Sequence, residues 1–204
     1  MALRLVTDCT IEPVSAADIH DFLKLPTTAE YTVINGMIKA ARQYAENYCK
    51  RAFNPQVWQL TLDGFPSGGI ELPRPPLTTD ASLVAITYYD TSAALQTLAS
   101  SAYSIDYETE PGILVPSTSS DDWPETNDQL NAVKIQFTCG YPYDTVGGGS
   151  TITVPESIKT WIKMRVGAMY ENREAIQEGS RSRYELPRSF IDGLLDQYII
   201  ISVP

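Results

Sequence analysis

The chain has 204 residues, 43% of them hydrophobic and 20% charged, and its 25 Asp and Glu outnumber its 15 Lys and Arg to give a formal net charge of −10. This length allows one or two domains with a sizeable core, and no segment approaches the ~20 apolar residues that a membrane span needs. A protein this acidic is not expected to bind DNA by neutralising its phosphates.

The first segment, through about residue 53, has helical patterns. "SAAD" at 15–18 has the spacing of a capping box and predicts a short helix that ends near Leu25-Pro26. "TTAE" at 27–30 predicts the start of a longer helix. Its apolar residues keep helical spacing on an arc of ordinary width, which core packing explains. They are Ile34, Met37, Ile38, Ala41, Tyr44, Ala45 and Tyr48.

The middle segment, 54–150, has the composition of strands and turns. "VWQLTLD", "SLVAITYYD" and "AVKIQFTCG" are rich in β-branched and aromatic residues, and the last alternates with the period of a half-buried strand. Weaker strands are predicted at "GIEL", "YSIDY" and "GILVP". Clusters of proline and glycine between these runs mark turns, and "VGGGST" has the composition of a flexible linker.

The third segment returns to helix. "VPESIKTWIKMRVGAMYENREAI" at 154–176 begins with a proline that the first helical turn tolerates, and its apolar arc spans well over half the circumference. Either this helix is buried on several sides, or it packs on its own core on one side and on another subunit on the other. Arg165 near the middle of the arc either makes a specific contact, across a subunit boundary or with a core carboxylate, or rests its stem on apolar surface with its head in water.

A basic connection, "EGSRSRYELP", leads to one more short helix in "PRSFIDGLLDQYI", and the sequence continues into "IIISVP". Helices at both ends with strands between predict an α+β fold. We expect a helical bundle formed by 1–53 and 151–204, with a β domain inserted at 54–150.

The search for catalytic chemistry yields little. His20 has no GxSxG context for a serine partner, and Asp121 and Asp122 beside Trp123 are best explained as solvated turn residues. The cysteines Cys9, Cys49 and Cys139 are odd in number, far apart and outside any CxxC pair, which favours reduced thiols in a cytoplasmic compartment. No phosphate-binding loop or dinucleotide motif occurs. We therefore expect no enzyme, metal or cofactor.

The order of the segments resembles the head–tail connector (adaptor, or head-completion) proteins of tailed bacteriophages. The resemblance runs through "AENYCKRAF", "NPQVWQLTLDGFP", "IELPRPPL", "VAITYYD", "NAVKIQFTCGYP" and "VPESIKTWIKMRVGAMYENRE". Two stretches depart from it. "YYDTSAAL" lacks the glycine expected in a hairpin turn, and "VGGGS" is longer than the family requires.

The resemblance implies a non-enzymatic virion protein that is assembled in the host bacterial cytoplasm and located at the neck. Such proteins form a closed ring, here of about twelve subunits, beneath the portal protein. The ring extends the DNA channel, binds no specific DNA sequence and contacts no membrane. It presents a docking surface to the next neck or tail completion protein.

Two sets of residues are candidates for these contacts. The subunit-interface candidates are Ile158, Trp161, Ile162, Arg165, Met169 and Arg173. The portal-docking candidates are Tyr198, Ile199, Ile200, Ile201 and Val203. The alternative for this tail is that it folds back onto its own helical core. Alternatives for the protein are a carbohydrate- or receptor-binding β module of a virion and, less favoured, a carboxylate-based hydrolase.

Overall fold

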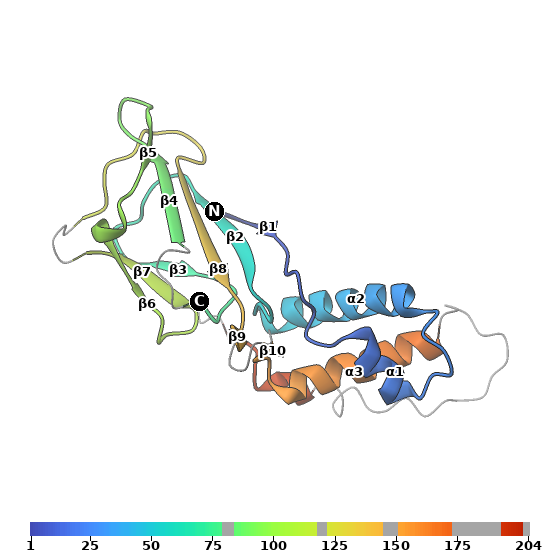
Figure 1. The fold of residues 1–204 in the computed structure, drawn as a ribbon. Coiled ribbons are helices and arrows are strands. Elements are labelled where there is room, and N and C mark those ends of the chain that lie inside the picture. Colours follow the sequence, from blue (N-terminus) through green and yellow to red (C-terminus); the bar gives the residue numbers. More distant parts are fainter. Residues whose placement is uncertain (79–83, 118–121, 145–150, 173–192, 202–204) are drawn as a thin grey trace, which may run out of the picture. The chain divides into compact units, whose positions relative to one another are not determined.

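The computed structural model describes residues 1–78, 84–117, 122–144, 151–172 and 193–201 (Figure 1). The chain divides into two compact units. The β unit consists of Met1–Thr10 and Asn54–Thr151, and the helical unit of Ile11–Phe53 and Ile152–Pro204. This mixture of helix and antiparallel sheet agrees with the predicted α+β class.

The N-terminus differs from the predicted organisation. Residues 1–53 are predicted to lie whole in the helical domain, but Ala2–Thr7 forms strand β1 of the β unit. The strand has six residues, and its side chains are mostly exposed on both faces. The alternation of buried and exposed residues, which usually identifies a strand, is therefore weak in this segment. Pairing with a distant strand, not a local pattern, makes this segment extended.

The larger sheet of the β unit has five antiparallel strands in the order β1-β2-β8-β4-β5 (Figure 1). The three strongest predicted strands are confirmed as β2, β8 and β4. The strands after β1 are β2 (Gln56–Leu62), β8 (Val133–Cys139), β4 (Val84–Tyr89) and β5 (Leu95–Thr97).

One face of this sheet supplies much of the core. In β8 the residues Val133, Ile135, Phe137 and Cys139 are buried, and the residues between them are half-buried. The register places Ile135 opposite Leu60 on one side and Ile86 on the other, and all three side chains are fully buried. This is the period of two that the sequence predicted.

A second sheet has three antiparallel strands in the order β3-β7-β6. They are β3 (Ile70–Leu72), β7 (Gly112–Pro116) and β6 (Tyr103–Asp106), and they confirm the three weaker predicted strands. A 3-10 turn, η2 (Ser100–Ala102), precedes β6. The buried Tyr103 hydroxyl donates to the carbonyl of Val84 on β4, 3.0 Å away, so a hydrogen bond joins the two sheets.

The β4–β5 hairpin shows how the chain turns without the expected glycine. Ala93 adopts a positive φ of 61°, which the sequence could not indicate. The carboxylate of Asp90 accepts hydrogen bonds from Ser92, from the Ala94 N–H and from the Gln96 amide. The bond from the Ser92 side chain is the largest cause that lowers the pKa of Asp90 to about 2. One aspartate therefore organises this turn.

Two short strands, β9 (Tyr143–Asp144) and β10 (Thr151–Ile152), pair with each other. The glycine-rich stretch that the sequence analysis interpreted as a linker is 145–150, between these strands, and it lies outside the described residues.

The first helix of the helical unit confirms the predicted capping box. Helix α1 (Ala16–Leu23) begins after Ser15, whose hydroxyl accepts from the Asp18 N–H at 3.1 Å while the Ser15 N–H donates to the Asp18 carboxylate at 2.9 Å. The hydrogen bond from the Ser15 side chain is the largest cause that lowers the pKa of Asp18.

The longer helix predicted to start at 27–30 is confirmed as α2 (Tyr31–Cys49), which has Glu30 at its N-cap with no side-chain hydrogen bond there. The Thr27 hydroxyl accepts instead from the Ala29 N–H at 3.3 Å, so it closes a local turn ahead of the helix. Helix α3 (Glu156–Glu171) is confirmed and begins directly after Pro155. Its predicted continuation from 173 to 176 lies outside the described residues.

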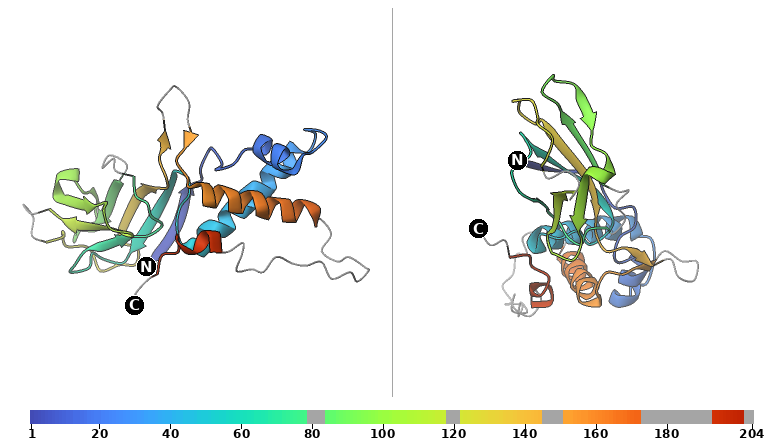
Figure 2. Two further views of the ribbon diagram at one scale, coloured as in Figure 1. Left: turned by 90° about the horizontal axis from the view of Figure 1, so that it is seen from below. Right: turned by 90° about the vertical axis from the view of Figure 1, so that its left-hand side faces the viewer.

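Helix α3 packs against both α1 and α2 (Figures 1 and 2). A Cβ atom on Gly167 would lie 3.2 Å from a methyl group of Leu23, so this glycine permits the close approach of α1. Nearly one turn further along α3, the Tyr170 hydroxyl donates to Glu30 at the start of α2. The core of the unit consists of fully buried aliphatic side chains, among them Ile19, Ile34, Ile38, Ile158, Ile162 and Val166. Among the described residues, the helices lack the combination of length and hydropathy that crossing a bilayer requires.

Candidate functional site

The predicted interface residues of α3 divide into buried and accessible groups. Ile158, Trp161 and Ile162 are covered within this chain, with at most 1% of each residue exposed. Arg165 is exposed and Met169 is half-buried, while Arg173 lies outside the described residues. Much of the broad apolar arc of α3 is therefore used by its own helical unit, and Arg165 and Met169 are the described candidates that another subunit could reach.

Arg165 contacts an aromatic ring. Its guanidinium carbon lies 5.5 Å from the centre of the Tyr44 ring on α2. The same ring stacks on Trp161 at 5.9 Å and on Tyr48 at 6.5 Å, with interplanar angles of 4° and 7°. A cation over an exposed aromatic face contributes about 0.5–1 kcal/mol. The guanidinium thus has a specific contact, but the partner is a tyrosine ring of the neighbouring helix.

Helix α2 exposes apolar surface that the sequence analysis assigned to core packing. Tyr44 is 52% exposed, Tyr48 39% and Val33 48%, and Met37 is half-buried. At 100° per residue these four side chains lie within about 60° of one another, on one flank of α2 beside the buried stripe. Core packing as the explanation for Tyr44 and Tyr48 is wrong. We call Val33, Met37, Tyr44, Tyr48 and Arg165 the aromatic face.

The indole of Trp161 stacks on the Tyr44 ring of this face from the inner side, toward the core. It is buried, and its Nε1–H has no hydrogen-bond partner among the described residues. An unpaired buried donor of this kind costs about 1–3 kcal/mol. Burial of a large ring therefore outweighs that cost here, because a fully buried aromatic side chain contributes several kcal/mol.

Helix α1 also carries an exposed apolar side chain, Phe22, but the exposed residues near it are acidic. Phe22 is 48% exposed, and the exposed Asp18, four residues earlier, lies on the same side of the helix, while the exposed Asp21 directly precedes Phe22 in the sequence. The Asp21 side chain is 86% exposed and lies 3.2 Å from His20 Nδ1. We call Phe22, Asp18 and Asp21 the acidic edge.

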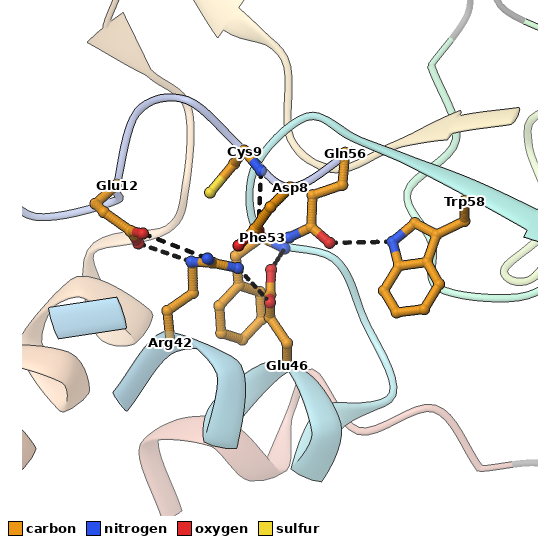
Figure 3. A network of polar contacts seen from close by, with 8 residues as sticks. All are labelled: Asp8, Cys9, Glu12, Arg42, Glu46, Phe53, Gln56 and Trp58. Carbon is orange, nitrogen blue, oxygen red and sulfur yellow. Dashed lines mark hydrogen bonds and ion pairs between the residues drawn. The ribbon is translucent and has the colours of Figure 1, made fainter. Parts of the chain in front are cut away.

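A buried ion-pair network holds the helical unit together and was missed by the sequence analysis (Figure 3). Arg42 is 1% exposed, and its guanidinium donates to Glu12 at 2.7 Å and to Glu46 at 2.7 Å. Glu46 also accepts from the Phe53 N–H at 2.8 Å. The spacing of Arg42 and Glu46 indicates a helical pair, but nothing local points to Glu12. The network is structural, since its charges are paired with one another, with Arg42 and Glu46 buried and Glu12 half-buried.

The portal-docking candidates begin in a segment that is held on the helical unit. Residues 193–196 are helical and Leu195 is fully buried. The Tyr198 carbonyl accepts from Arg51 at 2.7 Å, and the Ile200 N–H donates to the Cys49 carbonyl at 3.0 Å. The side chains of Tyr198, Ile199 and Ile200 are half-buried, whereas Ile201 is 82% exposed. Val203 lies outside the described residues.

The residues considered for chemistry are engaged in other contacts or lie apart. The Trp123 indole stacks on Phe65 at 5.0 Å and donates to the Gly68 carbonyl at 3.1 Å, while Asp121 lies outside the described residues. His20 is beside Asp21 on α1. In the part of the chain that the structure describes, no three or more His, Cys, Asp or Glu side chains form a group that could hold a metal ion.

Comparison of the fold with solved structures gives matches that extend over the whole chain. One is to the neck of an empty gene transfer agent particle computed with C6 symmetry, with a TM-score of 0.75, 18% identity and coverage of 100% of this chain and 98% of the other. The chain has this fold.

A second match, with equal coverage, is to the virion of a native gene transfer agent particle, at a TM-score of 0.74 and 18% identity. A third is to the neck of a native particle computed with C12 symmetry, at 0.72 and 17% identity, again with 100% and 98% coverage. No family description and no curated protein matches the sequence.

Proposed function

We propose that this chain is a structural protein of the neck of a tailed phage or phage-like particle and catalyses no reaction. The observation that carries the proposal is the fold match over 100% of the chain to chains of gene transfer agent particles, two of them neck structures. The order of sequence segments that resembles head–tail connector proteins supports it independently.

In this function the chain forms a ring beneath the portal protein, extends the DNA channel and joins the capsid to the next neck or tail protein. The C6 and C12 symmetries of the matching neck structures support a ring. The helical segments would form the bundle of each subunit, with the β unit inserted between them. The net charge of −10 supports passage of DNA without adhesion, since like charges repel.

Cryo-electron microscopy of purified particles that contain the chain tests this proposal. We expect density for a closed ring of this fold at the head–tail junction. Particles that are complete without the chain, or a chain located in the capsid shell or tail tip, would contradict it.

The tail from Ile199 is proposed to dock on the portal protein, with Ile201 as its most exposed described side chain. Its exposure supports this, because Ile201 is 82% exposed while Ile200 is tied to Cys49. Removal of 201–204 should leave the melting temperature unchanged but abolish attachment to portal rings. Removal of 199–204 is the comparison, since it also deletes the bond to Cys49 and should lower the melting temperature.

A second candidate is a carbohydrate-binding module, which the cluster of Phe65, Tyr88 and Trp123 in the β unit favours. Phe65 lies 5.7 Å from Tyr88 and 5.0 Å from Trp123, and all three rings are half-buried. Aromatic faces of this kind can stack on sugars, but here the rings also stack on one another. A glycan array with the wild type and Trp123→Ala tests this candidate, which needs saccharide binding that the substitution abolishes.

A further inference from the structure

We propose that neighbouring copies of this chain associate head to tail, with the aromatic face of one copy on the acidic edge of the next. This inference rests on the proposed ring and specifies the contact that closes it. The two surfaces are unlike each other and both belong to the helical unit. A cyclic ring of more than two subunits requires two different, complementary surfaces of this kind on each copy.

The first argument is chemical complementarity. The aromatic face presents two tyrosine rings with a guanidinium, and tyrosine, tryptophan and arginine are the side chains enriched at the centres of protein interfaces. The acidic edge presents one phenylalanine beside the exposed carboxylate of Asp21, while the Asp18 carboxylate accepts hydrogen bonds from Ser15 and interacts with Lys159 and Lys163. Phe22 can pack on the exposed tyrosines while Asp21 pairs with Arg165, because charge-assisted hydrogen bonds between guanidinium and carboxylate are strong and directional.

The second argument is the placement of the two surfaces on α3. Gly167 follows Arg165 by two residues, so the two positions point about 200° apart around the helix. Helix α1 packs at Gly167, where a Cβ would lie 3.2 Å from Leu23 and 3.8 Å from Phe22. Arg165 and the Tyr44 ring that it covers therefore lie on the side of α3 away from α1. The two surfaces therefore lie on opposite sides of α3, which allows each of them to contact a different neighbouring copy.

The third argument is the cost of leaving these side chains in water. Tyr44, Tyr48 and Phe22 are 52%, 39% and 48% exposed, although the interior of the same unit holds fully buried aliphatic side chains. Exposed apolar groups gathered along one flank of a helix mark interaction sites more often than single exposed residues do. A second copy covers both surfaces at once, including the ring of Tyr48, whose hydroxyl donates to Asp196 within the chain.

The experiment uses two full-length variants, Tyr44→Asp in the aromatic face and Phe22→Asp in the acidic edge. Sedimentation velocity and native mass spectrometry would follow the wild type and each variant up to about 1 mM, a concentration that reveals even weak association. We expect each variant alone to lose ring formation, with an association constant at least about 30-fold lower, the effect of a hot-spot residue. An equimolar mixture should form 1:1 heterodimers, because one intact copy of each surface remains.

Charge reversal gives a second measurement. Arg165→Glu and Asp21→Arg should each weaken association, and both changes in one chain should restore it at least partly. Leu130→Asp, at an exposed leucine of the β unit, is the matched control for an added carboxylate, and Arg4→Glu is the control for charge reversal. Unchanged circular dichroism confirms that the variants fold. Tyr44→Ser and Phe22→Ser replace any variant that does not fold.

The outcomes separate this inference from the proposed function. Rings that form from either variant alone, or a mixture that yields no heterodimer while the wild type forms rings, overturn the head-to-tail contact but leave the neck function standing. A wild type that stays monomeric at every concentration overturns the contact as well. A chain that is absent from the neck of the particles overturns the proposed function.

Discussion

Helices α2 and α3 pack on one another, but they use their aromatic side chains differently. On α3 the ring of Trp161 is 1% exposed, whereas on α2 the rings of Tyr44 and Tyr48 are 52% and 39% exposed. All three helices contact one another, so the reason is position on the helix: Trp161 lies on the side of α3 that faces α2, whereas Tyr44 and Tyr48 lie on a flank of α2 beside its buried stripe. The width of an apolar arc thus shows how much surface a helix can bury, and the neighbouring elements decide how much it does bury.

The largest expected effect is the loss of the buried ring of α3. Trp161→Ala should lower the free energy of unfolding by about 3–5 kcal/mol, because it removes a fully buried aromatic side chain and leaves a cavity. Urea denaturation followed by circular dichroism at 222 nm measures this. A loss below about 1 kcal/mol would show that Trp161 is not part of the core, and it would contradict the difference between the buried ring of α3 and the exposed rings of α2.

Trp161→Phe is the matched control for that change. It keeps a buried ring and removes an N–H that has no partner among the described residues. The loss in stability should therefore stay below about 1.5 kcal/mol, the usual cost of a volume change within a hydrophobic core.

The second-largest effect concerns the buried side of α2, where Arg42 and Glu46 form an ion pair among the apolar residues of the core. Glu46→Gln should cost about 3 kcal/mol of stability, the lower end of the range for breaking a buried pair, since Arg42 keeps Glu12 as a partner. Thermal and urea denaturation measure it. Glu156→Gln removes the exposed pair with Lys159 at 2.7 Å and should cost below about 1 kcal/mol. Equal effects of the two substitutions would contradict the buried network.

The third effect is a pH dependence at the end of α2. Burial is the largest cause that raises the pKa of the Cys49 thiol from 9.0 to about 11, so the folded protein favours the neutral thiol. Its contribution to stability is complete below pH 9 and is lost as the pH rises from about 9 to 11. Cys49→Ala should remove this part of the alkaline decline. At pH 8 the thiolate fraction of Cys49 should be roughly a hundredfold below that of an ordinary thiol, with alkylation slowed accordingly.

The smallest effect on stability is expected on the exposed flank of α2. Tyr44→Ala should change the free energy of unfolding by less than about 2 kcal/mol, since it removes a half-exposed ring, its stacking on Trp161 and Tyr48, and one exposed cation–π contact. The same substitution should abolish association between copies. A protein that loses several kcal/mol of stability on this change would show that Tyr44 belongs to the core after all.

The sequence predicted an element well where residues close together in the chain determine it. The Ser15–Asp18 capping box formed as expected because its hydrogen bonds join residues three positions apart. The alternation of Val133, Ile135 and Phe137 predicted β8 because one face of that strand is buried. Strand β1 was not predicted, because it depends on pairing with the distant β2. Helix α2 was predicted to start at 27–30 and begins at Tyr31, after a local turn in which the Thr27 hydroxyl accepts from the Ala29 N–H.

The candidate site was predictable only in part. The sequence identified α3 as an unusually apolar helix and Arg165 as an unusual residue in its arc, and the structure places Arg165 at the surface, over Tyr44. The sequence could not show that Ile158, Trp161 and Ile162 are covered by the chain's own helices, or that Tyr44 and Tyr48 are not. Periodicity reports which residues share a face of a helix, but exposure depends on what packs against that face.

By itself, the sequence determined the α+β class, most strands and helices, the acidic charge and the shortage of catalytic motifs, because each depends on composition or on residues close together in the chain. The tertiary structure alone decided that Glu12 pairs with Arg42, 30 residues away, and that Ala2–Thr7 joins the sheet. It also decided which aromatic rings face solvent. Contacts between segments far apart in the chain determine burial, and no local pattern encodes them.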